Sequence, residues 1–320
     1  SYPISVNGVA ATLRGSTFQA TIPISTRRTR VAATGPDGQA DITVIYDRGS
    51  FPRYRFSLDD NIWFLRDITQ KGYRSIFDNP YMALWKRLHD AYGTRVNCNI
   101  YFQCNDFNLS MMPDHYKDEW LDASSWFRLT FHALQNEPDR PYISAGYDQV
   151  AHDFDLVTGE IHRFAGEAAA NTFTTIHWGE ATRAGCRAVR DRGIRGLCGY
   201  FILDDHGVPQ VSYYADADLT RYMMERDYWM DLDEDLIFIR HAQVINSIPA
   251  AEIVPRLKAT AAKPHQGEVL ELMIHEQYFD PDYPAYLPDF GQRCETAVRW
   301  MADNGYQPVF YSDGFMGVPE

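Results

Sequence analysis

The pattern of apolar and polar residues differs between two parts of the chain. Residues 1–50 contain short runs rich in Thr, Val and Ile, such as "FQATIPIS" and "ADITVIYD", and Gly, Asn and Asp separate these runs. Short β-prone runs with turn residues between them predict hairpins. We therefore expect residues 1–50 to form a small antiparallel sheet or sandwich.

From about residue 51, short apolar runs alternate with stretches of helical periodicity. In "NPYMALWKRLHDAYG" the pattern predicts a helix with Asn79 as N-cap, Pro80 in the first turn and Gly93 as the stop. Further helices are expected at 147–164, 180–193, 249–261 and 289–304. Strands are expected at 54–58, 95–103, 126–131, 173–176, 196–201, 236–240, 269–274 and 308–311.

Strands that alternate with helices indicate an α/β fold with a parallel sheet. The length of residues 51–320 suits a (β/α) barrel of seven or eight strands, preceded by the small β module of residues 1–50. A doubly wound open sheet is the competing architecture. The sequence has no GxGxxG or GxxxxGK[ST] motif that would indicate a nucleotide site.

Charge and composition narrow the classes of function. The formal net charge of −13 argues against a nucleic-acid partner, because phosphates require a basic face. No apolar stretch is long enough for a transmembrane helix. The start of the chain lacks a signal-peptide pattern, so both a cytoplasmic protein and the mature form of a secreted or periplasmic bacterial protein remain open. The five scattered cysteines are expected to be buried thiols. A homo-oligomer is compatible with the sequence.

Polar residues with catalytic chemistry follow several of the expected strands. Asp59 and Asp60 follow "YRFSL", and His132, His177 and His275 follow three later strands. The strands of a parallel barrel end at one rim, where active sites lie. Each residue also has a structural reading: the Asp pair suits a turn or helix cap, and each His suits a core or capping role. His241 follows another strand without a supporting motif, and we read it as structural.

A carboxylate and two imidazoles form a three-ligand catalytic Zn²⁺ site, although Co²⁺, Ni²⁺ and Fe²⁺ also accept this set. A divalent metal lowers the pKa of a bound water and polarises a carbonyl. A second carboxylate can then act as general base and a His as general acid. One residue of the pair Asp59–Asp60 would bind the metal and the other would take a proton, and the metal's charge would keep both ionised.

The motifs resemble those of the polysaccharide deacetylase superfamily of carbohydrate esterases. "FSLDD" resembles its first motif, which implies that Asp59 is the catalytic base and Asp60 a metal ligand. "RLTFHALQN" resembles its second motif, H-[S/T]-x-x-H, with His132 as the first histidine. "ELMIHE" resembles its late L-x-H motif, which implies that His275 is the general acid. Residues 1–50 are similar in composition to the Ig-like modules that precede some carbohydrate-active domains.

Two features of the family pattern are missing. Asn136 stands where the second motif has its second histidine, and the segment "IHWGEATRAGCRAVRDRGI" lacks the Arg-Pro-Pro-Tyr core of the third motif. We expect His177 to replace the missing histidine as metal ligand, with Asn136 or Glu137 as the alternative. Arg183 would replace the arginine that orients the base. Residues expected to contact substrate are Trp178, Glu180, Arg183, Asn136 and Glu137.

Three functions follow from this reading. The first is a Zn²⁺-dependent carbohydrate deacetylase, in which activated water hydrolyses an acetamide or ester. The second is a glycoside hydrolase or another polysaccharide-cleaving enzyme, which would use Asp59, Asp60 and Glu180 without a metal. The third is a carbohydrate-binding barrel that has lost its metal and its activity.

Overall fold

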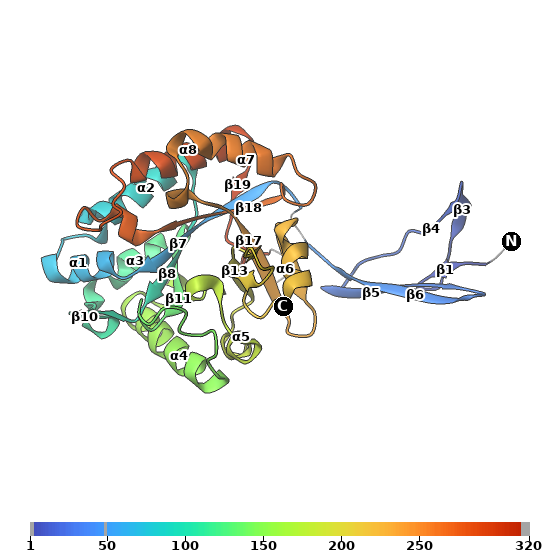
Figure 1. The fold of residues 1–320 in the computed structure, drawn as a ribbon, viewed down its shortest axis with the longest axis horizontal. Helices are drawn as coiled ribbons and strands as arrows, with labels where there is room; N and C mark the ends of the chain where they lie inside the picture. The colour runs from blue at the N-terminus through green and yellow to red at the C-terminus, as the bar shows by residue number, and fades with distance from the viewer. Residues whose placement is uncertain (1–2, 48–49, 315–320) are drawn as a thin grey trace. The chain divides into compact units, whose positions relative to one another are not determined.

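The computed structural model describes residues 3–47 and 50–314 (Figure 1). The chain divides into two compact units, of which one is Phe51–Ser312 and the other includes the first 50 residues. In the smaller unit, β1 (Ser5–Val6), β2 (Val9–Ala10), β5 (Arg28–Gly35) and β6 (Gly38–Ile45) form an antiparallel sheet in the order β2-β1-β5-β6. A hairpin of β3 (Thr12–Arg14) and β4 (Thr17–Gln19) completes it. The expected antiparallel sheet is therefore confirmed.

The larger unit is a nearly closed parallel barrel, as predicted. Seven strands pair in the order β11-β8-β7-β18-β17-β13-β12. Their bounds are β7 Arg53–Asn61, β8 Val96–Tyr101, β11 Phe127–Ala133, β12 Phe173–Thr174, β13 Gly196–Gly199, β17 Leu236–Val244 and β18 Val269–His275. The two ends of this order, β11 and β12, are linked by a single backbone bridge between Leu129 and Ala170. We call this junction the seam of the barrel.

Helices surround the strands (Figure 1). They are α1 Trp63–Lys71, α2 Pro80–Tyr92, α3 Lys117–Ala123, α4 Tyr147–Phe164, α5 Arg183–Arg190, α6 Ala217–Met224, α7 Ile253–Ala261 and α8 Phe290–Asp303. Short pairings complete the unit: β9 Gln103–Cys104 with β10 Phe107–Asn108, β14 Ile202–Leu203 with β15 Pro209–Gln210, β16 Tyr228–Asp231 with β17, and β19 Gln307–Pro308 with β7. No helix of the described residues is long and apolar enough to cross a membrane.

Helix α2 shows how local sequence signals fix an element. The side chain of Asn79 accepts hydrogen bonds from the backbone N–H groups of Tyr81 and Met82, and Pro80 occupies the first turn. Gly93 ends the helix with φ at 68°, in the left-handed region that glycine adopts without strain. The predicted bounds of this helix are therefore confirmed.

Strand β7 is buried on both faces, and the two faces differ in chemistry. Its even-numbered side chains belong to the apolar core: Tyr54, Phe56 and Leu58. On the other face, the Arg55 guanidinium forms a fully buried ion pair with Glu271 of β18. Because side chains alternate along a strand, Asp59 lies on this polar face, which lines the inside of the barrel.

Several elements differ from the sequence prediction, among them one barrel strand and three helices. Strand β17 does not end before His241 but continues to Val244, with a register shift between His241 and Gln243. Helices α1, α3 and α6 were not predicted. They are nine, seven and eight residues long.

Candidate metal centre

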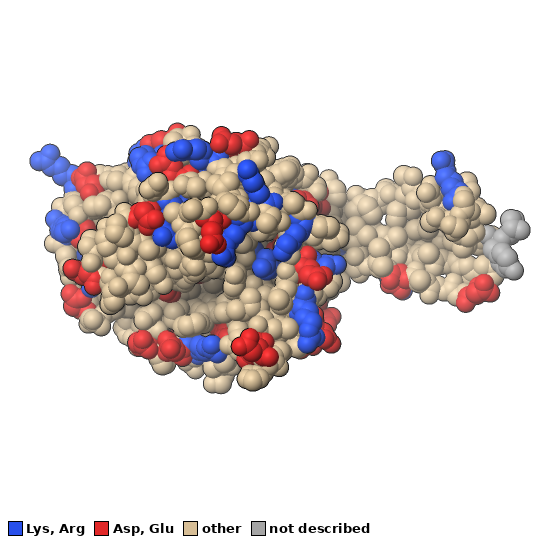
Figure 2. Space-filling view, turned by 45° about the horizontal axis from the view of Figure 1, so that its top comes forward, with Lys and Arg blue, Asp and Glu red and all other residues tan. Residues whose placement is uncertain are grey.

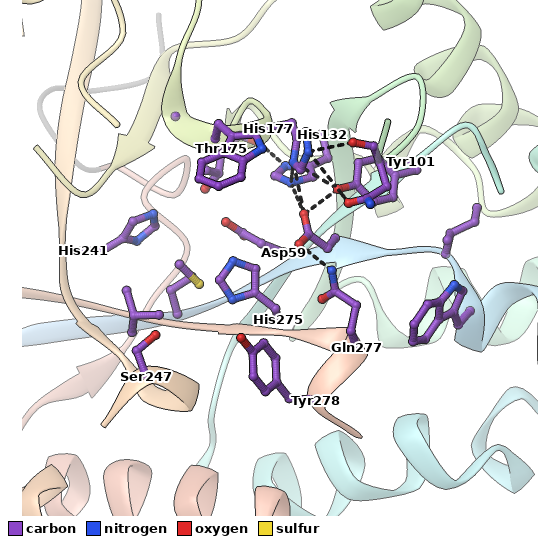
Figure 3. A pocket seen from close by; sticks show the side chains of 18 of the residues that line it. Asp59, Tyr101, His132, Thr175, His177, His241, Ser247, His275, Gln277 and Tyr278 are labelled. Carbon is purple, nitrogen blue, oxygen red and sulfur yellow. Dashed lines mark hydrogen bonds and ion pairs between the residues drawn. The ribbon is translucent and has the colours of Figure 1, made fainter. Parts of the chain in front are cut away.

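A large cavity of about 1410 Å³ opens at the carboxyl ends of the barrel strands. The predicted residues Asp59, Asp60, His132, His177 and His275 all line it. Figure 3 labels these residues except Asp60. In the space-filling view, charged side chains of both signs lie on the face shown (Figure 2). The structure therefore brings five residues together, although the first of them, Asp59, and the last, His275, are more than 200 positions apart in the sequence.

The two adjacent aspartates reach the same cavity because the backbone departs from regular strand geometry between them. Asp60 has φ at 62°, in the left-handed region, and the pairing of β7 with β8 shifts register between Leu58 and Asn61. In a regular strand, consecutive side chains point to opposite faces. The irregularity turns the Asp60 carboxylate toward the cavity that Asp59 also lines.

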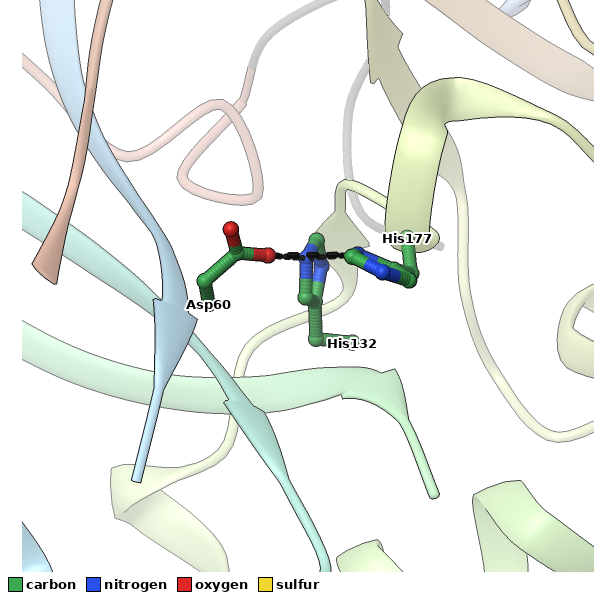
Figure 4. A group of neighbouring side chains, drawn as sticks. All are labelled: Asp60, His132 and His177. Atoms are coloured by element: carbon green, nitrogen blue, oxygen red, sulfur yellow. Dashed lines mark hydrogen bonds and ion pairs between the residues drawn. The ribbon is translucent and has the colours of Figure 1, made fainter. Parts of the chain in front are cut away.

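The carboxylate of Asp60 and two imidazoles converge on one point (Figure 4). Asp60 Oδ1 lies 2.9 Å from His132 Nε2 and 3.1 Å from His177 Nδ1. The two imidazole nitrogens lie 3.2 Å apart. These are the three residues that the sequence analysis assigned to the metal, and the described residues contain no other cluster of this kind.

Backbone carbonyls fix which nitrogen of each imidazole faces the centre. His132 Nδ1 lies 2.5 Å from the carbonyl oxygen of Thr175, and His177 Nε2 lies 3.2 Å from that of Asn136. A carbonyl only accepts, so these nitrogens carry hydrogens, and in the neutral imidazole the opposite nitrogens then face Asp60 with lone pairs. Burial lowers the pKa of His132, which favours the neutral, metal-binding form. Three lone-pair donors in contact fit a divalent cation.

Asp59 lies beside this centre in a different environment. Its Oδ1 accepts hydrogen bonds from Ser57 Oγ at 3.0 Å and from Asn99 Nδ2 at 2.5 Å. Burial, followed by the neighbouring charge of Asp60, raises the pKa of Asp59 to about 8. Both hydrogen bonds reach Oδ1, so Oδ2 is left to accept a proton.

His275 ends β18 and lines the cavity close to Gln277 and Tyr278 (Figure 3). Its Nδ1 lies 3.0 Å from Oδ1 of Asn246. This contact leaves Nε2 as the nitrogen that can exchange a proton with a bound molecule. Burial lowers the pKa of His275.

Three of the five residues expected to contact substrate line the cavity: Trp178, Asn136 and Glu137. Trp178 is 40% exposed, and the Arg140 guanidinium lies 5.3 Å from the centre of its ring. Glu180 does not line the cavity, because its carboxylate accepts a hydrogen bond from the Val211 backbone and pairs with Arg140.

The interpretation of Arg183 as the group that orients the catalytic base is wrong. Arg183 begins α5, is half exposed, and forms ion pairs with Asp231 and Glu234. Asp59 is held by Ser57 and Asn99 instead. These two neutral side chains lie on β7 and β8 inside the barrel, so the orienting group comes from the strands and not from a loop arginine.

Other residues of the site were missed in the sequence. Tyr101 ends β8 and its hydroxyl contacts Asp60, while Gln277 Nε2 donates to Asp60 Oδ2 at 2.7 Å. The strand predicted from the sequence runs from 95 to 103, so Tyr101 does not lie at its predicted end, and the rule that strand-end residues face the rim does not point to it. His241, which we read as structural, is buried in the cavity wall, and neither ring nitrogen has a hydrogen-bond partner among the described residues.

Comparison with known proteins gives matches to solved structures only. No family model and no curated protein matches the sequence. A 4-alpha-glucanotransferase from Thermococcus litoralis matches with a TM-score of 0.51 and 9% identity, over 83% of this chain and 40% of that one. This chain therefore spans less than half the length of the glucanotransferase.

An esterase and a deacetylase that act on carbohydrates also match. A family 4 acetyl xylan esterase from Clostridium thermocellum, solved with a cobalt ion, has a TM-score of 0.42 and 12% identity, over 82% of this chain and 89% of that one. A peptidoglycan N-acetylglucosamine deacetylase has a TM-score of 0.45 and 10% identity, over 86% and 94%. The likeness is one of fold. Deacetylases are thus among the solved structures that match this chain.

Proposed function

We propose that this chain is a metal-dependent hydrolase that removes an acyl group, as an acetamide or an ester, from a carbohydrate. One observation carries the proposal. Lone pairs of Asp60, His132 and His177 converge within 3.2 Å of one another, directly beside the carboxylate of Asp59, in a cavity large enough for several sugar rings.

The three donors supply the first part of the chemistry. Asp60 Oδ1, His132 Nε2 and His177 Nδ1 would hold a divalent metal, for which we propose Zn²⁺. When bound, such a metal lowers the pKa of water and polarises a carbonyl. The carbonyls of Thr175 and Asn136 orient the two imidazoles.

Asp59 and His275 supply the proton transfers. Asp59 Oδ2 would take a proton from the attacking water, and the hydrogen bonds from Ser57 and Asn99 keep the carboxylate in place. A nearby cation would lower the pKa of Asp59 from its raised value and favour the basic form. His275 would act as the imidazolium: its Nδ1–H stays on Asn246, and Nε2 would give its proton to the leaving amine or alcohol, which leaves the neutral imidazole.

Residues on the cavity wall suit a carbohydrate. The exposed ring of Trp178 offers a flat apolar face for a sugar ring, and Asn136 and Glu137 offer polar groups beside it. Glycoside cleavage by Asp59, Asp60 and Glu180 has less support, because Glu180 lies off the cavity and Asp60 is directed at two imidazoles.

The test is acetate release from acetylated xylan and from an N-acetylglucosamine oligosaccharide, two substrate types chosen from the names of the matching esterase and deacetylase. Purified protein, stripped of metal and reloaded with Zn²⁺ or Co²⁺, is expected to release acetate only in the loaded form. New reducing ends are measured in the same reactions.

The outcomes separate the three functions. Acetate without new reducing ends supports the deacetylase. Reducing ends formed in the presence of a chelator support glycoside cleavage. Binding of the sugars without either product supports a barrel that has lost its activity.

A further inference from the structure

We propose that Tyr101 is a fourth protein ligand of the metal centre. The inference rests on the proposed metal site and extends it. Tyr101 is the last residue of β8 and is only 2% exposed. Its hydroxyl oxygen lies 2.5 Å from Asp60 Oδ1 and 3.0 Å from His177 Nδ1 (Figure 3).

The number of hydrogens available around the Tyr101 hydroxyl is smaller than the number of acceptor atoms there, which favours a bound cation. A tyrosine hydroxyl has one hydrogen to donate. Around it lie three acceptors: Asp60 Oδ1, the lone pair of His177 Nδ1, and Asn136 Oδ1 at 3.2 Å. The lone pair of His132 Nε2 adds a fourth electron-rich atom in contact with Asp60 and His177. One hydrogen cannot satisfy this set, whereas a metal ion at its centre can.

The spacing is close to that of a tetrahedral site. Four ligands at about 2.0–2.1 Å from a metal are separated from one another by about 3.3 Å. Five of the six distances among Tyr101 Oη, Asp60 Oδ1, His132 Nε2 and His177 Nδ1 are 2.5, 2.9, 3.0, 3.1 and 3.2 Å, all except that between Tyr101 Oη and His132 Nε2. A small outward movement of these side chains would therefore seat an ion between them.

The fourth ligand would be the phenolate, with its proton released to solvent when the metal binds. Catalytic zinc sites can expand to five ligands, so a phenolate ligand is compatible with hydrolysis at the same metal. Since Tyr101 comes from β8, the ligands would then come from the ends of β7, β8 and β11 and from the segment after β12.

The phenolate can be tested by its spectrum. Fe³⁺ bound to a phenolate absorbs visible light through charge transfer, and Fe³⁺ bound to carboxylate and imidazole alone lacks this band. The metal-free full-length protein is loaded with one equivalent of Fe³⁺, and the visible spectrum and iron content are recorded. We expect a coloured protein, and loss of the band in Tyr101→Phe.

Zinc affinity is the second readout, measured by calorimetry. Loss of groups that merely orient ligands weakens metal binding by about 10–100-fold, so Tyr101→Phe should weaken Zn²⁺ binding at least about tenfold. The matched control is Tyr283→Phe, since Tyr283 lines the same cavity but packs against Trp63 and Tyr278. It should keep both the band and the affinity.

A colourless protein on Fe³⁺ loading, or a band that persists in Tyr101→Phe, would overturn the proposal. If Tyr101→Phe does not fold, the spectrum of the unchanged protein still decides. Zinc binding with no phenolate band overturns the role of Tyr101 alone, whereas a protein that binds no metal overturns the proposed function as well.

Discussion

At the scale of single residues, the chemistry depends on two adjacent aspartates with different environments. Asp59 is held by two neutral donors, Ser57 and Asn99, whereas Asp60 faces two imidazoles. The left-handed backbone at Asp60 is what allows neighbours in sequence to serve the same cavity. The pair can therefore divide the roles of base and ligand.

This division predicts the effect of Asp59→Asn. The amide keeps the size of the side chain and the acceptor for Ser57 and Asn99, but it cannot take a proton. We expect the rate of acetate release to fall by roughly 10²–10⁴-fold, with the metal content unchanged. Rate and metal content are measured on the same preparation.

The control for this variant is Asp106→Asn, which changes an acid on the cavity wall that pairs with Arg66. It should leave the rate unchanged. Loss of metal in Asp59→Asn would contradict the assignment and indicate that Asp59 is itself a ligand.

At the scale of elements, one buried carboxylate pairs with three arginines of helix α5. Glu234, in the turn between β16 and β17, is 1% exposed and forms ion pairs with Arg183, Arg187 and Arg190 of α5. The hydrogen bond from Arg187 is the main reason that the pKa of Glu234 falls to about 2 from 4.5. Arg183 thus serves the packing of α5 and not the catalytic base.

The pKa of Glu234 predicts acid sensitivity. Because the folded-state pKa is lower than the unfolded-state value, this carboxylate stabilises the fold above about pH 4.5, and the contribution disappears as the pH falls toward 2. Glu234→Gln should lower Tm at pH 6, and the difference from the unchanged protein should shrink between pH 4.5 and 2.

Thermal unfolding followed at several pH values checks this expectation. The control is Glu225→Gln, which changes an exposed acid at the end of α6. A Tm difference for Glu234→Gln that stays constant down to pH 2 would show that the ion pairs do not hold the helix.

At the scale of the whole barrel unit, the candidate metal centre lies across the seam. His132 belongs to β11 and His177 follows β12, the two strands that end the sheet order. Few backbone contacts join these strands, and side-chain bonds such as the one from Thr174 Oγ1 to the backbone carbonyl of Phe131 supplement them. A bound ion would therefore link the two edges of the barrel.

Metal binding should accordingly stabilise the fold. At a free Zn²⁺ concentration 100 times Kd, the free energy of unfolding should rise by about 2.7 kcal/mol. Chelation should lower Tm, and hydrogen exchange should show the largest gain in protection on metal addition at β11 and β12. The same stabilisation in His132→Ala would contradict a metal at this site.

The sequence by itself determined the parts of this protein that depend on local signals. The caps of α2, the alternation of strands and helices, and the polar residues at strand ends can all be read without coordinates. They led to the barrel and to the Asp59–Asp60 pair, His132, His177 and His275 as neighbours at one rim, whereas the choice of Asp60 as the ligand came from the family resemblance. Each of these signals lies within a short stretch of sequence, because the side-chain period and the cap and turn residues of an element depend on neighbouring residues.

Only the tertiary structure decided which groups meet at the site. Tyr101, Asn99 and Gln277 contact the aspartates although they belong to strands or turns far away in sequence. Arg183 and Glu180 instead bind partners outside the site, and no sequence motif predicts these partners. The bulge at Asp60 and the continuation of β17 past His241 depend on pairing with neighbouring strands. Contacts of this kind are set by packing and register, which no short stretch of sequence contains.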